Sequence, residues 1–161
     1  MHRDKLDDID ITLIELLQQK ARIKRGQLAE KVGLSIPTIS ERLHKLEDHG
    51  IIRGYHAVLE PRKVDLQITA FIFLITESST YYTEIVANAE ARKEVLECHA
   101  ITGKGSHLLK VRSQNTASLE KLLADIQSWP GVKHTMTDVV LSSTKETTEL
   151  PLNHLRKQPD K

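Results

Sequence analysis

The sequence contains one cysteine, Cys98, among its 161 residues, so a disulfide framework within the chain is excluded. No apolar run approaches the roughly 20 residues that a membrane-spanning helix needs. The N-terminus also lacks the apolar core of a signal peptide. These absences together predict a cytoplasmic protein.

Aromatic residues are scarce, at 4% of the chain, and the formal net charge is only +1. Stacking on single-stranded bases needs aromatic platforms, which this composition disfavours. The net charge by itself does not indicate a nucleic-acid partner. The length allows one medium domain or two small ones.

Motifs for catalysis and for metal binding are also missing. The sequence has no nucleophile elbow, no phosphate-cradling G-x-x-x-x-G-K loop, no Cys-x-x-Cys and no His-Glu-x-x-His. Cys98 and His99 could start a metal site with His107 or His134, but adjacent residues of a strand point to opposite faces. We therefore predict no metal site, no required cofactor and no enzymatic activity.

Residues 27–46 have the pattern of two helices joined by a tight turn. The first helix spans Gln27–Val32, and Gly33 follows it where a helix C-cap needs a residue that tolerates positive φ. Ser35 is placed as the N-cap of the second helix, and Pro37 lies in its first turn, where a missing N–H costs little.

The second helix has one apolar and one polar face. A stripe with a period near 3.6 contains Ile36, Ile39, Leu43 and Leu46. Opposite it lie Pro37, Thr38, Glu41 and Lys45, flanked by Ser40 and Arg42. A helix–turn–helix protein presents such a face to the major groove of DNA. The alternative is an ordinary helical hairpin with a solvated outer face.

Charge is concentrated around this stretch. Residues 20–45 contain seven cations and two carboxylates, which gives a local charge of +5. Phosphate contacts require such a basic surface, although a chance cluster on a solvated face is the alternative. An acidic patch precedes it, made of Asp4, Asp7, Asp8, Asp10 and Glu15.

A helix over residues 8–20 completes a three-helix domain, and residues 51–59 continue as a strand or hinge toward Pro61. The pattern then changes to β-α-β-β-α-β, with strands at 66–76, 95–102, 107–112 and 132–144 and helices at 81–92 and 116–127. This order predicts a ferredoxin-like sandwich whose open sheet face is covered by dimerisation. The fold class is thus α+β, with an N-terminal helix–turn–helix, winged-helix-like domain. A small enzyme is the alternative, because ferredoxin-like domains include some.

The chain resembles the Lrp/AsnC family of transcription regulators, also called feast/famine proteins. The resemblance rests on LDDIDITLIELL at 6–17, LAEKVGLS at 28–35, ERLHKLEDHGIIRGYHAVLEP at 41–61, ITGKGSHLLKV at 101–111 and WPGVKHTMTDVVL at 129–141. We place a DNA-binding domain at 1–53, a linker at 54–64, a ligand-binding and oligomerisation domain at 65–145 and a polar, loosely ordered tail at 146–161.

The resemblance implies a sequence-specific regulator that binds double-stranded DNA through the helix at 35–46. It also implies a homodimer that builds larger assemblies such as octamers. Together with the helical pattern, it predicts DNA contacts from Lys24, Arg25, Lys31, Ser35, Pro37, Thr38, Ser40, Glu41, Arg42 and Lys45. In this set, the cations contact phosphates, and Thr38, Ser40 and Glu41 read base edges.

Small effectors of the family, usually amino acids, bind between C-terminal domains of neighbouring dimers. The residues implied here are Thr102, Gly103, Lys104, Gly105, Ser106, His107, Thr135 and Thr137. The family's loop usually reads Gly-x-x-Asp, but Ser106 stands at the Asp position and Lys104 adds a cation, which favours an anionic ligand. A ligand-independent regulator and a plain hairpin turn are the alternatives. A further alternative is an amino-acid-sensing or assembly module whose DNA-binding domain is vestigial. The local charge of +5 argues against this alternative.

Overall fold

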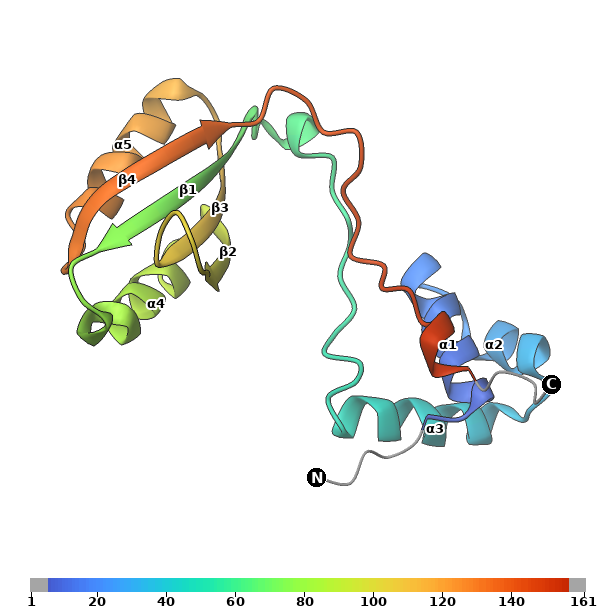
Figure 1. Ribbon diagram of the computed structural model, residues 1–161. Coiled ribbons are helices and arrows are strands. Elements are labelled where there is room, and N and C mark those ends of the chain that lie inside the picture. The colour runs from blue at the N-terminus through green and yellow to red at the C-terminus, as the bar shows by residue number, and fades with distance from the viewer. Residues whose placement is uncertain (1–5, 157–161) are drawn as a thin grey trace. The chain divides into compact units, whose positions relative to one another are not determined.

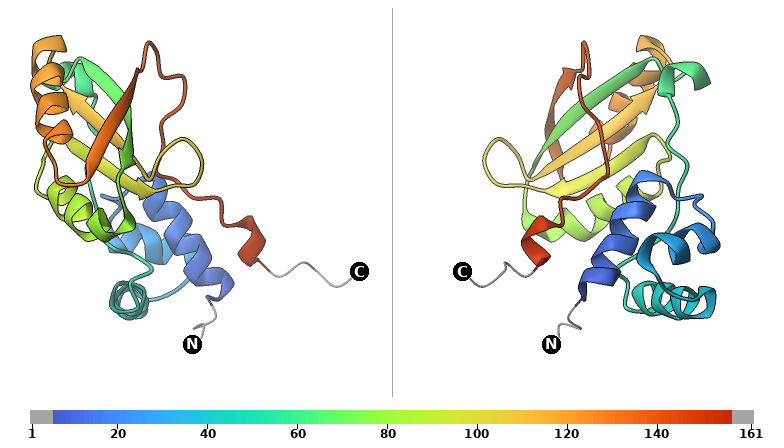
Figure 2. Two further views of the ribbon diagram at one scale, coloured as in Figure 1. Left: turned by 60° about the vertical axis from the view of Figure 1, so that its left-hand side comes forward. Right: turned by 90° about the vertical axis from the view of Figure 1, so that its right-hand side faces the viewer.

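The computed structural model describes residues 6–156, which form two compact units (Figures 1 and 2). One unit takes in residues up to 58 together with residues from 145 onward, and the other spans residues 59–144. Asp4 of the predicted acidic patch and the last five residues of the predicted tail lie outside the described residues. No helix within residues 6–156 is long and apolar enough to cross a membrane.

Three helices build the N-terminal unit, as the sequence predicts: α1 (Asp8–Gln19), α2 (Arg25–Val32) and α3 (Ile36–Asp48). Each turns an apolar stripe inward. The shared core is made of Leu13, Leu17, Leu28, Ala29, Ile39, Leu43 and Leu46. Burial of these side chains is the main force that holds three short helices together, because helices of this length are marginal in isolation.

The helix ends follow the predicted capping residues. Gly33 ends α2 in the left-handed region at φ +71°, and the Ser35 hydroxyl accepts a hydrogen bond from the Thr38 N–H at 3.3 Å. Pro37 occupies the first turn of α3. At the start of α1, the Asp7 carboxylate accepts from the Asp10 N–H at 2.8 Å, and the Asp10 carboxylate accepts from the Asp7 N–H at 3.3 Å. This reciprocal capping box fixes the first turn of α1.

One predicted core position is wrong. Ile36 is 51% exposed, whereas Ile39, Leu43 and Leu46 of the same stripe are buried. The reason is local: Ile36 is the first residue of α3 and lies alongside Gly26 of α2, where an added Cβ would be 3.8 Å from Ile36 Cδ1. Glycine provides no side chain to cover that end of the stripe.

The second unit is an antiparallel sheet with two helices on one face (Figure 2). Its strands β1 (Ile68–Thr76), β2 (Val95–Ala100), β3 (His107–Ser113) and β4 (Val132–Val139) pair in the order β2-β3-β1-β4. The helices α4 (Tyr82–Glu90) and α5 (Thr116–Gln127) complete the predicted β-α-β-β-α-β order. Short 3₁₀ helices lie at Pro61–Val64, Ser79–Tyr81 and Asn153–Leu155.

Strand β1 is buried on one face only. Ala70, Ile72 and Leu74 face the helices and are fully buried, whereas Phe71 and Phe73 between them are half-buried. The apolar run at 66–76 is confirmed as a strand with one buried face. Within residues 59–144 no second layer covers the other face of the sheet, which is the open face that the sequence predicts.

One strand is shorter than its predicted range. Strand β4 ends at Val139, before the predicted boundary at residue 144, and a last backbone hydrogen bond joins the Val140 N–H to the Thr69 carbonyl of β1 at 2.9 Å. Residues 51–59, predicted as a strand or hinge, include no strand, so the hinge alternative agrees with the structure.

The polar C-terminal segment is attached to α1, in contrast to the predicted loosely ordered tail. Gln18 Nε2 donates to the Leu150 carbonyl at 3.1 Å, and Gln18 Oε1 accepts from the Leu150 N–H at 2.7 Å. The Arg156 guanidinium pairs with Glu15 at 2.6 Å and donates to Thr12 at 3.3 Å. Composition predicts a polar tail but does not reveal these partners on α1.

Candidate nucleic-acid interface

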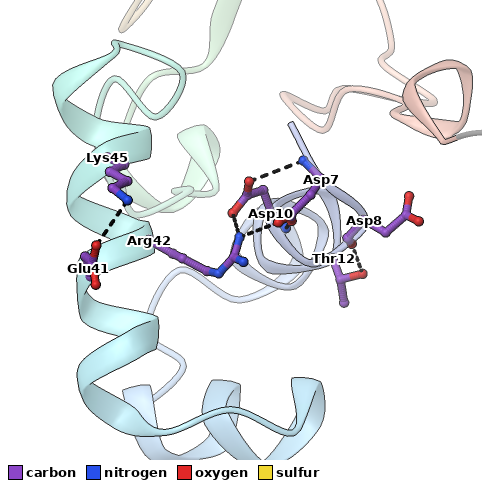
Figure 3. Close-up of polar contacts among 7 residues, drawn as sticks. All are labelled: Asp7, Asp8, Asp10, Thr12, Glu41, Arg42 and Lys45. Atoms are coloured by element: carbon purple, nitrogen blue, oxygen red, sulfur yellow. Dashed lines mark hydrogen bonds and ion pairs between the residues drawn. The ribbon is translucent and has the colours of Figure 1, made fainter. Parts of the chain in front are cut away.

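The predicted reading face of α3 lies at the surface. Pro37, Glu41 and Lys45 are exposed, and Thr38 is half-buried with its hydroxyl 2.8 Å from that of Ser35. Lys45 Nζ lies 3.1 Å from the Glu41 carboxylate, and the two side chains are 65% and 68% exposed (Figure 3). An ion pair this exposed is weak, so both groups are available to another partner.

Cations of α2 and of its N-cap lie at the surface, and one of them reaches α3. Lys24, Arg25 and Lys31 are exposed, and Lys24 is the N-cap residue of α2. Arg25 Nη1 donates to Ser40 Oγ at 3.2 Å, which links the start of α2 to the flank of α3. The helix N-terminus and its basic side chains together favour an anion at this position.

Arg42 is held differently from the other cations. Its Nη1 donates to Asp7 Oδ2 and to Asp10 Oδ1, each at 2.7 Å, so that α3 is joined to the first turn of α1 (Figure 3). The Arg42 side chain is 26% exposed, and those of Asp7 and Asp10 are 49% and 18% exposed. We call these three residues the Asp7–Asp10–Arg42 cluster.

Arg42 and Asp7 stay ionised at neutral pH. Hydrogen bonds from Arg42 to Asp10 and Asp7 raise the pKa of the guanidinium further above its usual range. Burial raises the pKa of the Asp7 carboxyl, but hydrogen bonds from the Asp10 N–H and from Arg42 lower it by more, so the net shift is downward. The ion pair between Arg42 and Asp7 therefore does not change across the physiological pH range.

A cavity of about 600 Å³ lies beside the cluster. Its polar lining includes Asp7, Asp10, Glu41, Arg42 and Lys45, and its apolar lining includes Leu6, Leu46 and Ile51. The sequence predicts Arg42 and Lys45 at this surface, but it does not predict the two aspartates as their neighbours. The capping-box spacing of Asp7 and Asp10 indicates a helix start, not a partner on another helix.

The predicted effector residues belong to the other unit. Thr102, Gly103 and Lys104 are exposed in the loop between β2 and β3. Ser106 anchors that loop to β1, because its N–H and its hydroxyl both donate to the Leu74 carbonyl, at 2.8 and 3.1 Å. Gly105 is required for this close approach: a Cβ there would lie 2.6 Å from the same carbonyl oxygen.

Three further effector candidates lie on the helix-covered side of the sheet. His107 and Thr135 are the register partners of Leu74 on β3 and β4, and Thr137 is the partner of Ile72. His107 is 2% exposed, and Thr135 Oγ1 accepts a hydrogen bond from Gln127 Nε2 at 3.0 Å. The structure thus places the predicted effector residues of the loop next to His107 on β3. Thr135 and Thr137 lie on β4, and β1 lies between β3 and β4 in the sheet.

Cys98 and the histidines named as metal candidates do not converge. Within the described residues, no group of three or more His, Cys, Asp or Glu side chains is arranged to hold a metal ion. His99 instead lies 3.1 Å from Glu97, and burial raises the pKa of the Cys98 thiol.

Both units match known protein families. Residues 6–53 match the family model for winged helix-turn-helix DNA-binding domains, and residues 69–150 match the model for the Lrp/AsnC ligand binding domain.

Curated relatives are similar along nearly the whole chain. The HTH-type transcriptional regulator FL11 of Pyrococcus abyssi is 36% identical over 150 residues, which cover 93% of this chain and 99% of the relative. The leucine-responsive regulatory protein of Haemophilus influenzae is 37% identical over 150 residues, covering 91% of this chain and 90% of the relative.

A solved structure agrees with the fold as well. A transcriptional regulator from Neisseria meningitidis, crystallised as a complex with L-methionine, superposes with a TM-score of 0.88 at 35% identity. The match covers 94% of this chain and 99% of that one.

Proposed function

Since this chain belongs to the Lrp/AsnC family of transcriptional regulators, we propose that α3 is the helix that reads duplex DNA. The chain is a regulator and not an enzyme. The observation that carries the proposal is the exposed polar face of α3, which has the basic Arg25 side chain of α2 at its flank. A helix–turn–helix places such a face in the major groove.

Within this interface the side chains have different roles. Phosphates are contacted by the exposed cations of the helix–turn–helix, which are Lys24, Arg25, Lys31 and Lys45. Thr38, Ser40 and Glu41 read base edges, with Glu41 accepting from cytosine N4, while Ser35 caps α3 and Pro37 stiffens its first turn. A two-fold dimer then presents two such helices to a nearly palindromic site.

The second unit is proposed to bind a small metabolite that changes how dimers assemble. The effector is an amino acid, in keeping with the L-methionine complex of the Neisseria regulator, or a related anion. An anion is favoured by Lys104 in the loop and by Ser106, which is uncharged and occupied with the Leu74 carbonyl. Higher oligomers such as octamers form through this unit.

Selection of bound duplexes from a random pool, followed by gel shift, tests the DNA-binding role. Lys45→Ala should weaken binding to every sequence alike and reduce the salt slope by about 0.9, the share of one neutralised phosphate. Thr38→Ala should mainly relax the sequence preference. If both variants bind like the wild type, α3 is not the reader.

Calorimetry tests the effector site with a panel of amino acids and small anions. We expect heat from one member of the panel together with a change in assembly, measured by light scattering. Lys104→Ala should weaken an anionic effector more than a zwitterionic one. A panel that gives neither heat nor a change in assembly would reject the effector proposal.

A further inference from the structure

We infer that Arg42 is a positioning residue, which holds the reading helix to α1 through Asp7 and Asp10 and does not contact DNA phosphate. The inference rests on the proposed role of α3 as the reader. It reverses the expectation from sequence, in which Arg42 is one more cation of the basic surface.

The first argument is geometric. Helix α2 packs closely against both α1 and α3, whereas the backbones of α1 and α3 scarcely approach each other. The long Arg42 side chain crosses this wider gap and reaches the first turn of α1 (Figure 3). Asp7 and Asp10 are themselves fixed there by the capping box. The cluster therefore sets the position of α3 relative to a rigid point on α1.

The second argument is electrostatic. Two carboxylates surround one guanidinium, so the Asp7–Asp10–Arg42 cluster carries a net charge of −1 and repels a phosphate. Moving Arg42 to a phosphate would leave Asp10, only 18% exposed, without its cation. Lys45 differs in charge and in exposure. It pairs with one carboxylate, that of Glu41, and both side chains are exposed, so water can solvate each of them when the pair separates.

Replacing Asp10 separates the two roles by the sign of the effect. Asp10→Asn removes a negative charge beside the interface. If Arg42 leaves Asp10 to bind a phosphate, this change should strengthen DNA binding. If Arg42 positions α3, the same change should weaken DNA binding, roughly fivefold, because a charge-assisted hydrogen bond becomes a neutral one.

Asp8→Asn is the matched control. It makes the same change of charge in the same turn of α1, but the Asp8 carboxylate points away from Arg42 (Figure 3). Its affinity for DNA should equal that of the wild type or exceed it slightly. Stronger binding by Asp10→Asn than by Asp8→Asn would overturn the inference.

The salt dependence of binding gives a second readout. Arg42→Gln should lower the affinity and the Tm of the N-terminal unit while leaving the salt slope unchanged, whereas Lys45→Gln should reduce the slope and leave the Tm unchanged. A reduced slope for Arg42→Gln with an unchanged Tm would contradict the positioning role.

A charge swap covers the case in which Arg42→Gln does not fold. The double variant Arg42→Asp/Asp10→Arg keeps one cation and two carboxylates in the cluster, and it should recover Tm and affinity relative to Arg42→Asp alone. Recovery of Tm without any recovery of affinity would assign Arg42 to DNA. If the folded wild type binds no duplex DNA at low salt, the proposed DNA-binding function is wrong. That result differs from a wild type that binds DNA and variants that contradict the positioning role of Arg42.

Discussion

At the scale of single residues, His107 links the stability of the second unit to pH. Its ring meets Tyr82 edge-on at 4.7 Å between centroids, and burial lowers its pKa below the ordinary 6.5. The unfolded chain therefore takes up a proton at a higher pH than the folded protein does. Stability should fall as the pH drops through 6.5 and continue to fall until the pKa of the folded state is reached.

Thermal unfolding between pH 7.5 and 5 measures this effect. His107→Gln keeps a polar side chain next to the Ser106 hydroxyl, which lies 3.1 Å from His107 Nδ1, but it has no proton to gain. The Tm of the variant should depend less on pH than that of the wild type over this range. Parallel Tm profiles would show that His107 does not couple folding to pH.

Gly105 allows the loop before β3 to dock on β1. An alanine there would place its Cβ 2.6 Å from the Leu74 carbonyl oxygen, which is backbone and cannot move aside cheaply. We expect Gly105→Ala to destabilise the second unit by about 1–3 kcal/mol, as overpacked sites do. Denaturant titration measures this loss, and Gly26→Ala, whose Cβ has ordinary contacts at 3.8 Å, is the control.

At the scale of elements, the C-terminal segment depends on one glutamine of α1. Gln18→Ala removes both hydrogen bonds to the Leu150 backbone, so amides of residues 145–156 should exchange roughly tenfold faster. Hydrogen exchange followed by mass spectrometry reports this directly. Gln19→Ala changes the exposed neighbour and should leave the exchange of the segment as it is in the wild type.

The sequence predicts elements well where their determinants are local. The Ser35 cap, the αL glycine at 33 and the period of α3 all lie within a few residues of what they determine, and each is confirmed. The partners of Arg42 and Arg156 lie 32 or more positions away on α1, and no local pattern encodes such a pairing. Whether an apolar stripe is covered, as at Ile36, likewise depends on the neighbouring helix.

At the scale of the whole molecule, the open face of the sheet is the surface expected to join two copies. Phe71 and Phe73 lie on it, half-buried, beside Met136 of β4. Phe73→Lys should shift the protein toward monomer, because pairing two sheets would bury the added charge without a partner. Light scattering measures the mass, and Val86→Lys at an exposed position of α4 is the control.

Far-UV circular dichroism must show that the Phe73→Lys protein keeps its fold. A folded variant of unchanged mass would mean that another surface joins the copies.

The order in which the chain contributes to its two units has a consequence for biosynthesis. The three helices are synthesised before the second unit. The C-terminal segment, which binds α1 through Leu150 and Arg156, follows the whole of the second unit in sequence. During translation, the helical unit emerges from the ribosome long before its last piece. In the nascent protein, α1 of the DNA-binding unit therefore gains its hydrogen bonds to residues 150–156 only after β4 has left the exit tunnel.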